Sequence, residues 1–85
     1  MITRENVVEK IRKYLQREIT ITVLVDWAET AMMDGEFDEK HFDDIRTVLS
    51  QLGLADVRAF GLTWEDCDEL LGTLGYSTRV EIVVA

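Results

Sequence analysis

The sequence predicts a mainly α-helical fold of four amphipathic helices followed by a short C-terminal β-strand. Apolar residues recur at three- and four-residue spacing in four segments, and a residue suited to a helix N-cap precedes each segment. Glycines follow three of these segments, as expected at helix C-termini. The predicted helices are residues 4–17, 21–33, 39–52 and 64–74, and the predicted strand is residues 77–84.

Length and composition predict a single globular domain, residues 1–85. Apolar residues make up 47% of the chain and charged residues 31%, which is typical of folded rather than disordered proteins. No apolar run reaches the roughly 20 residues of a membrane span, and no signal-peptide pattern is visible at the N-terminus. Cys67 is the only cysteine, so no intramolecular disulfide can form. We therefore expect a cytoplasmic protein without a membrane segment.

The first two helices have clear start signals. Thr3 can cap the first helix, and Thr20 can cap the second. Ile19 and Leu24 have the spacing of a hydrophobic staple around the second start. Residues 19–23 also alternate like a short strand, but the cap and staple together favour a helix start.

An acidic corner, residues 34–38, separates the second and third predicted helices. Gly35 suits the left-handed conformation that ends a helix. Asp38 can cap the next helix, with Phe37 and Phe42 at staple spacing around it. The predicted inner face of the third helix is Phe42, Ile45, Val48, Leu49 and Leu52.

The last two helix ends follow the same rules. Gly53, with Leu54 placed to touch Leu49, predicts a Schellman end for the third helix. Thr63 and Asp66 form a potential capping box for the fourth helix, in which Asp replaces the usual Glu or Gln. Cys67, Leu70, Leu71 and Leu74 form the predicted inner stripe, and Gly75 ends the helix. The following strand needs a pairing partner, which is either residues 56–60 or a neighbouring chain.

The charge distribution indicates what the protein binds. The net charge is −8, which argues against nucleic acid or an anionic membrane as partner. Residues 1–20 carry five basic and three acidic groups, whereas residues 21–45 carry one basic and eight acidic groups. The negative charge is therefore concentrated around the acidic corner, where a basic protein is the expected partner.

Two charges of the acidic corner have no evident role in folding. Asp38 is explained by capping, but Asp34 lies in the last turn of a helix, where a carboxylate opposes the dipole by about 0.3–1 kcal/mol. Glu36 beside it adds repulsion. A calcium loop is excluded, because Met32 and His41 would occupy ligand positions that require oxygen donors. The predicted partner-binding residues are Asp26, Trp27, Glu29, Asp34, Glu36, Asp38, Asp43 and Asp44.

The sequence offers little for catalysis. His41 is the only histidine, Cys67 falls on an inner helix stripe, and no set of metal ligands or phosphate-binding glycine loop occurs. We expect no catalytic residue, no metal and no cofactor, and therefore no enzyme. Trp27 and Trp64 each suit either a half-buried core position or an interface beside carboxylates.

The chain resembles a family over roughly residues 7–74. A first amphipathic helix is followed by Ile19-Thr20, Trp27, the acidic corner, a helix with Phe42, Leu49 and Leu52, and a helix with Leu70-Leu71 and Leu74. This order is similar to that of small acidic bacterial immunity proteins of the colicin D type. The resemblance implies a helical bundle whose acidic face blocks the basic cleft of a nuclease toxin.

Two functions follow from these observations. The first is an acidic interaction module for a basic protein, of which an inhibitor is one form. The second is a structural homodimer or assembly subunit joined through the C-terminal strand.

Overall fold

The computed structural model of the chain describes residues 1–55 and 62–76. This part of the chain contains four α-helices, α1 (Arg4–Leu15), α2 (Ile21–Asp34), α3 (Phe42–Leu52) and α4 (Trp64–Thr73), and a 3-10 helix, η1 (Glu39–His41). The mainly helical prediction is confirmed there. The predicted strand, residues 77–84, and its suggested intramolecular partner, residues 56–60, lie outside the described residues.

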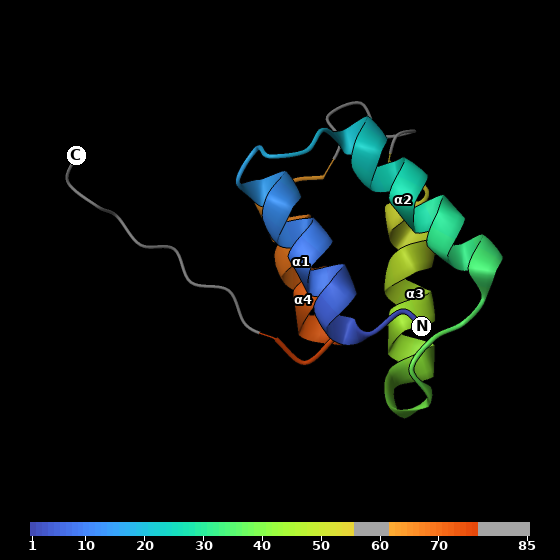
Figure 1. Ribbon diagram of the computed structural model, residues 1–85. Helices are drawn as coiled ribbons and strands as arrows, with labels where there is room; N and C mark the ends of the chain where they lie inside the picture. The colour runs from blue at the N-terminus through green and yellow to red at the C-terminus, as the bar shows by residue number, and fades with distance from the viewer. Residues whose placement is uncertain (56–61, 77–85) are drawn as a thin grey trace.

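The helices form a bundle in which α1 and α3 each contact all of the other α-helices. Helices α2 and α3 make the most extensive pair, and α1 packs against α2, α3 and α4. Figure 1 shows α1 beside α4 on one side of the molecule and α2 beside α3 on the other. The acidic corner and η1 lead from the end of α2 to the start of α3. Within the described ranges, no helix is long and apolar enough to cross a membrane.

Threonine caps set three of the helix starts, as predicted. The Thr3 hydroxyl accepts from the Asn6 amide, and the Asn6 side chain accepts from the Thr3 amide, which completes a capping box. Thr63 and Asp66 form the predicted second capping box at 3.1 and 3.0 Å. Thr20 accepts from the Val23 amide at 3.3 Å. Each cap satisfies a backbone donor that a helix start leaves unpaired.

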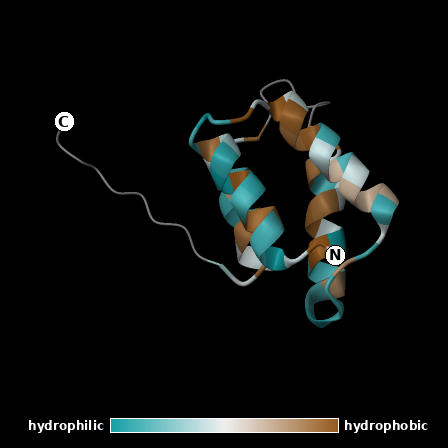
Figure 2. Ribbon diagram, in the orientation of Figure 1, coloured by the Kyte–Doolittle hydropathy of each residue, from teal (hydrophilic) through white to brown (hydrophobic). Residues whose placement is uncertain are grey.

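Apolar stripes from all four helices meet in one core, and Figure 2 shows these stripes along the ribbons. Cys67 is fully buried in this core, as its position on the α4 stripe predicts. The largest fully buried side chains are Ile11, Leu24, Ile45, Leu49, Leu52 and Leu74.

The predicted start of the third helix is wrong by three residues. Residues 39–41 form η1, and His41, with φ −131° and ψ 27°, interrupts the helical backbone before Phe42. Phe42 was expected inside but is 39% exposed. The predicted staple with Phe37 is nevertheless present, since the two ring centroids are 5.5 Å apart. Phe42 therefore packs on the acidic corner rather than deep in the core.

The ends of α1 and α3 also differ from the prediction, whereas α2 and α4 end within one residue of it. Helix α1 stops at Leu15 rather than at residue 17, because Arg17 adopts a left-handed conformation with φ 62°. The Schellman end at Gly53 is wrong, since Gly53 keeps right-handed angles, φ −64° and ψ −17°. Leu54 consequently points outward and is 63% exposed. Gly35 and Gly75 do take the left-handed conformation, with φ 69° and 87°.

Candidate protein-interaction site

The acidic corner is held by the first residues of the chain. The Ile2 amide donates to the Glu36 carbonyl at 2.8 Å, and the Asp38 amide donates to the Ile2 carbonyl at 2.9 Å. These bonds form a parallel bridge between Ile2 and Phe37. At the other end, the Gly35 amide donates to the Ala31 carbonyl at 3.3 Å and closes α2. The corner backbone is therefore fixed both by its own helix and by a segment distant in sequence.

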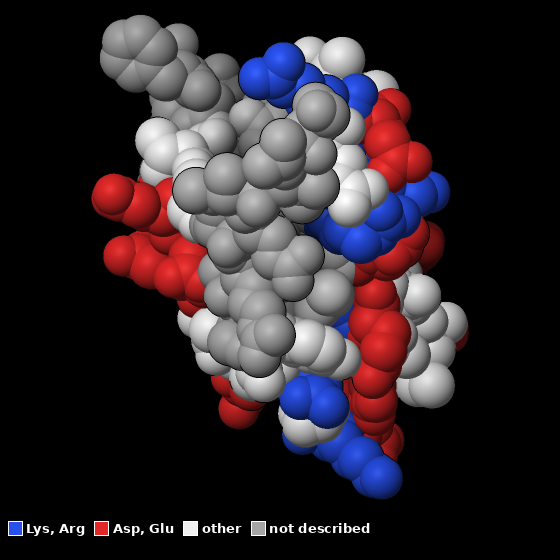
Figure 3. Space-filling view, turned by 90° about the vertical axis from the view of Figure 1, so that its left-hand side faces the viewer, with Lys and Arg blue, Asp and Glu red and all other residues white. Residues whose placement is uncertain are grey.

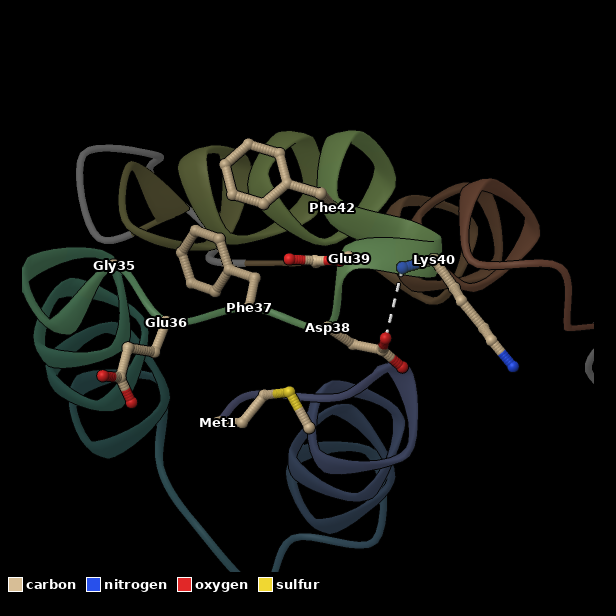
Figure 4. A pocket seen from close by; sticks show the side chains of 8 residues that line it. All are labelled: Met1, Gly35, Glu36, Phe37, Asp38, Glu39, Lys40 and Phe42. Atoms are coloured by element: carbon tan, nitrogen blue, oxygen red, sulfur yellow. Dashed lines mark hydrogen bonds between the residues drawn. The ribbon is translucent and has the colours of Figure 1, made fainter.

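A hollow of about 700 Å³ lies beside this bridge, and we call it the corner groove. Its apolar lining comes from Met1, Phe37 and Phe42. Phe37 is buried, whereas Phe42 is 39% exposed and Met1 is 75% exposed. Charged side chains surround these apolar groups (Figure 4). The full lining is Met1, Gly35, Glu36, Phe37, Asp38, Glu39, Lys40 and Phe42.

The charged groups of the corner groove have different orientations. The Asp38 carboxylate accepts from the Lys40 amide at 3.2 Å and so caps η1. Glu39 directs its carboxylate toward the Phe37 ring, whereas the Lys40 ammonium points away from both rings (Figure 4). Among residues 1–55 and 62–76, neither Glu36 nor Glu39 forms an ion pair. The groove thus combines exposed aromatic surface with carboxylates that its own lysine does not neutralise.

The structure brings some of the predicted site residues together. Asp34 and Glu36 line a second, smaller hollow with Met1 and Ile2, next to the corner groove. Asp43 and Asp44 lie in the first turn of α3 and line a further hollow with η1. These four carboxylates and Asp38 form a continuous set around the segment from the end of α2 to the start of α3.

The other predicted residues lie elsewhere on α2. Asp26 and Glu29 are exposed, and Glu29 lines an apolar hollow with Met33 and Leu54. Trp27 is half-buried against the core, and the Lys10 ammonium of α1 lies 5.6 Å from the centroid of its ring. Trp27 therefore joins α2 to α1 and is not part of the corner groove.

The two tryptophans differ in burial. Unlike Trp27, Trp64 is 44% exposed and lies at the first position of α4. Trp27 is thus the half-buried tryptophan of the core, and Trp64 is the more exposed of the two. Glu65 and Asp66 follow it in the first turn of the helix.

The acidic corner contrasts with the α1 face. There Arg12 pairs with Glu9 and, at 3.2 Å, with Glu18. These contacts raise the pKa of Arg12 and lower the pKa of Glu9, chiefly through their shared hydrogen bond. Figure 3, which views the molecule from the α1 and α4 side, shows basic and acidic side chains intermixed on that face. Within the described part of the chain, none of Asp34, Glu36, Asp43 and Asp44 has such a basic neighbour at ion-pair distance.

The groups around the corner are suited to binding cations. Carboxylates accept hydrogen bonds from basic groups, and aromatic faces attract guanidinium or ammonium ions.

Cys67 lies apart from the acidic corner, in the core. Burial raises the pKa of its thiol to about 11, with a smaller contribution from Asp66. No group of three or more His, Cys, Asp or Glu side chains converges on a metal position within residues 1–55 and 62–76.

The chain matches no protein-family model, no curated protein and no solved structure. The resemblance to colicin D-type immunity proteins therefore remains a prediction from the sequence.

Among the residues that line the corner groove, only Glu36 and Asp38 were predicted as binding residues. Phe42 was assigned to the inner face of its helix, and Met1, Glu39 and Lys40 were given no role in binding. The staple spacing of Phe37 and Phe42 was the available signal, because a staple keeps its second residue near the helix start. No local pattern could reveal Met1, which reaches the groove through the bridge between Ile2 and Phe37.

Proposed function

We propose that this chain is a protein-interaction module whose acidic surface binds a basic protein partner. One observation carries the proposal: the carboxylates from Asp34 to Asp44 surround one corner of the fold, and those that do not cap a helix lack ion pairs among the described residues. Repulsion among them costs stability that a basic partner would recover.

The corner backbone also supports binding. The bridge at Ile2 and the left-handed Gly35 fix the segment that carries Glu36. A fixed surface loses less conformational entropy when a partner binds. Complementary charge further accelerates association and discriminates against acidic partners.

Inhibition is the form of this function that the resemblance to immunity proteins suggests. An acidic surface of this kind would cover a basic cleft and exclude a negatively charged substrate from it. The proposal includes no catalytic step, because it assigns to the corner carboxylates only the capture of basic groups.

A charge-reversal experiment tests the proposal with a fluorescent lysine-rich peptide as the probe. We expect the double variant Asp34→Lys, Glu36→Lys to bind the peptide roughly ten-fold more weakly at low salt, since each unit-charge pair at contact is worth about 1 kcal/mol in water. The matched control is Glu65→Lys, Glu69→Lys, which changes the net charge equally on α4. Fluorescence anisotropy measures both affinities, and circular dichroism checks that both variants fold.

The control decides between a local surface and a net-charge effect. A large loss of peptide affinity in the corner variant, together with a small loss in the α4 variant, supports the proposal. Equal losses in both variants, or unchanged binding by the corner variant at low salt, would overturn it.

A further inference from the structure

We propose that the corner groove takes an arginine side chain of the basic partner, stacked on Phe42 and paired with Glu39. This inference rests on the proposed function, and it specifies which basic group the acidic surface recognises.

Phe37 and Phe42 form an aromatic pair with only one member in the core. Their centroids are 5.5 Å apart and their planes are inclined by 54°, so Phe37 supports Phe42 from the core side. Phe37 is buried, but Phe42 is 39% exposed. An aromatic ring that remains partly in water beside carboxylates is a suitable surface for the flat face of a guanidinium group.

An arginine also lies over an aromatic ring elsewhere in the molecule, where a carboxylate bonds to the ring hydroxyl and the arginine is the chain's own. The Arg4 guanidinium carbon lies 5.3 Å from the centroid of the Tyr76 ring, and the Tyr76 hydroxyl donates to Glu5 at 3.5 Å. Cation, ring and carboxylate are thus all supplied internally there. At the corner groove, Phe42 and Glu39 provide the ring and the carboxylate, and within the described residues no cation lies over Phe42.

The nearest lysine does not complete the corner groove. The Lys40 ammonium points away from the rings (Figure 4). The backbone amide of Lys40 donates to the Asp38 carboxylate at 3.2 Å. Asp38 is therefore engaged in capping, which leaves Glu39, whose carboxylate is directed toward the Phe37 ring, as the carboxylate beside the aromatic pair (Figure 4). A planar guanidinium can stack on Phe42 and donate two hydrogen bonds to one carboxylate, whereas an ammonium cannot do both with the same geometry.

A second copy of this chain is a poor occupant for the groove. Each copy carries a net charge of −8, so two copies repel each other. An arginine from a basic partner has the complementary charge.

The experiment uses three peptides that differ in one residue type. Matched unstructured peptides carry arginine, lysine or the uncharged analogue citrulline at the same positions. We expect wild-type protein to bind the arginine peptide several-fold more tightly than the lysine peptide, and the citrulline peptide not at all. Phe42→Leu should lower the affinity for the arginine peptide about two- to five-fold and leave the affinity for the lysine peptide unchanged.

Two control variants accompany Phe42→Leu. Among the described residues, Trp64 is the other exposed aromatic residue beside carboxylates, and Trp64→Leu should change neither affinity. Glu39→Gln should lower the affinity for the arginine peptide more than Glu69→Gln does, although each substitution removes one negative charge. In wild-type protein with labelled methionine methyl groups, the arginine peptide should shift the Met1 resonance and not that of Met33, which lies at a different hollow.

The outcomes separate this inference from the proposed function. Absence of binding to both charged peptides at low salt overturns the proposed function and the inference with it. Equal affinity for arginine and lysine peptides, with no effect of Phe42→Leu, overturns the inference alone. A loss caused by Trp64→Leu instead of Phe42→Leu, or a shift at Met33 instead of Met1, also overturns it.

Discussion

Ile2 and Phe37 form a parallel bridge in which the Ile2 amide donates to the carbonyl before Phe37 and the Ile2 carbonyl accepts from the amide after it. The two bonds are 2.8 and 2.9 Å long. They fix the backbone between Glu36 and Asp38, whose side chains belong to the acidic corner. The N-terminal segment is thus part of the surface to which we assign partner binding.

Replacing Ile2 by proline should loosen the acidic corner. Proline has no amide hydrogen, so the bond to the Glu36 carbonyl is lost, at a cost of about 0.5–1.5 kcal/mol. We expect faster hydrogen exchange at the Asp38 amide, which is the other bridge donor. Ile2→Val preserves the backbone donor and is the control. Equal Asp38 exchange in the two variants would show that the bridge does not hold the corner.

Arg4 should stabilise the closure of α4 onto α1. Its guanidinium donates to the Leu74 carbonyl at 3.0 Å and lies over the Tyr76 ring. Arg4→Met retains an unbranched side-chain stem but removes both interactions, and we expect a loss of about 1–3 kcal/mol in the free energy of unfolding. Urea denaturation measures the loss. Arg46→Met, on the exposed side of α3, should change stability by less than about 0.5 kcal/mol.

Two glycines near the end of α4 should respond in opposite directions to alanine. Gly75 has φ 87°, and an added Cβ would lie 3.1 Å from an Arg4 nitrogen, so Gly75→Ala should destabilise by about 1 kcal/mol or more. Gly72 lies within α4, and an added Cβ would meet no atom within 4 Å. Gly72→Ala should therefore stabilise by up to about 1 kcal/mol. Thermal unfolding of the two variants compares them directly, and a destabilised Gly72→Ala would contradict the exposed position of Gly72.

Cys67 should be unreactive in the folded protein. It is fully buried, and burial raises the pKa of its thiol to about 11. A thiol reagent should modify it slowly under native conditions and completely in urea, because the thiolate is the reactive form. Rapid modification of the native protein would show that α4 opens readily.

The same pKa shift predicts a dependence of stability on pH. Because the folded pKa is higher than the unfolded value of about 8.5, the contribution of Cys67 is fully present below about pH 8.5 and is lost as the pH rises toward the folded value. The urea midpoint of wild-type protein should therefore fall across this range. Cys67→Ala should show a smaller fall, and an identical fall in both proteins would assign the effect to other groups.

Local signals account for most of the helices that the sequence predicted. The caps at Thr3, Thr20 and Thr63 and the left-handed residue Gly35 depend on neighbours within a few positions, so they can be read from the sequence. The prediction failed at Gly53, because Leu54 makes a right-handed turn by bonding to the Gln51 carbonyl. Glycine permits the left-handed conformation but does not require it.

The candidate site was less predictable than the helices. The concentration of acid around Asp34 and Glu36 was visible, and the structure places both beside Met1 and Ile2. The contacts that complete the site join residues far apart in sequence, and no local pattern indicates such pairs. Phe42 was misplaced because α3 begins at this residue rather than at residue 39, after the break in the helical backbone at His41.

The N-terminal segment, residues 2–6, has two attachments that link distant parts of the chain. Ile2 bonds to the acidic corner, and Arg4 and Glu5 contact the chain just after α4. Contacts this far apart close long loops at a high entropic cost, so we expect them to form late in folding, after α2 has packed on α3. A partner that binds the ordered corner favours the docked N-terminal segment, and through Arg4 it stabilises the end of α4, which it does not touch.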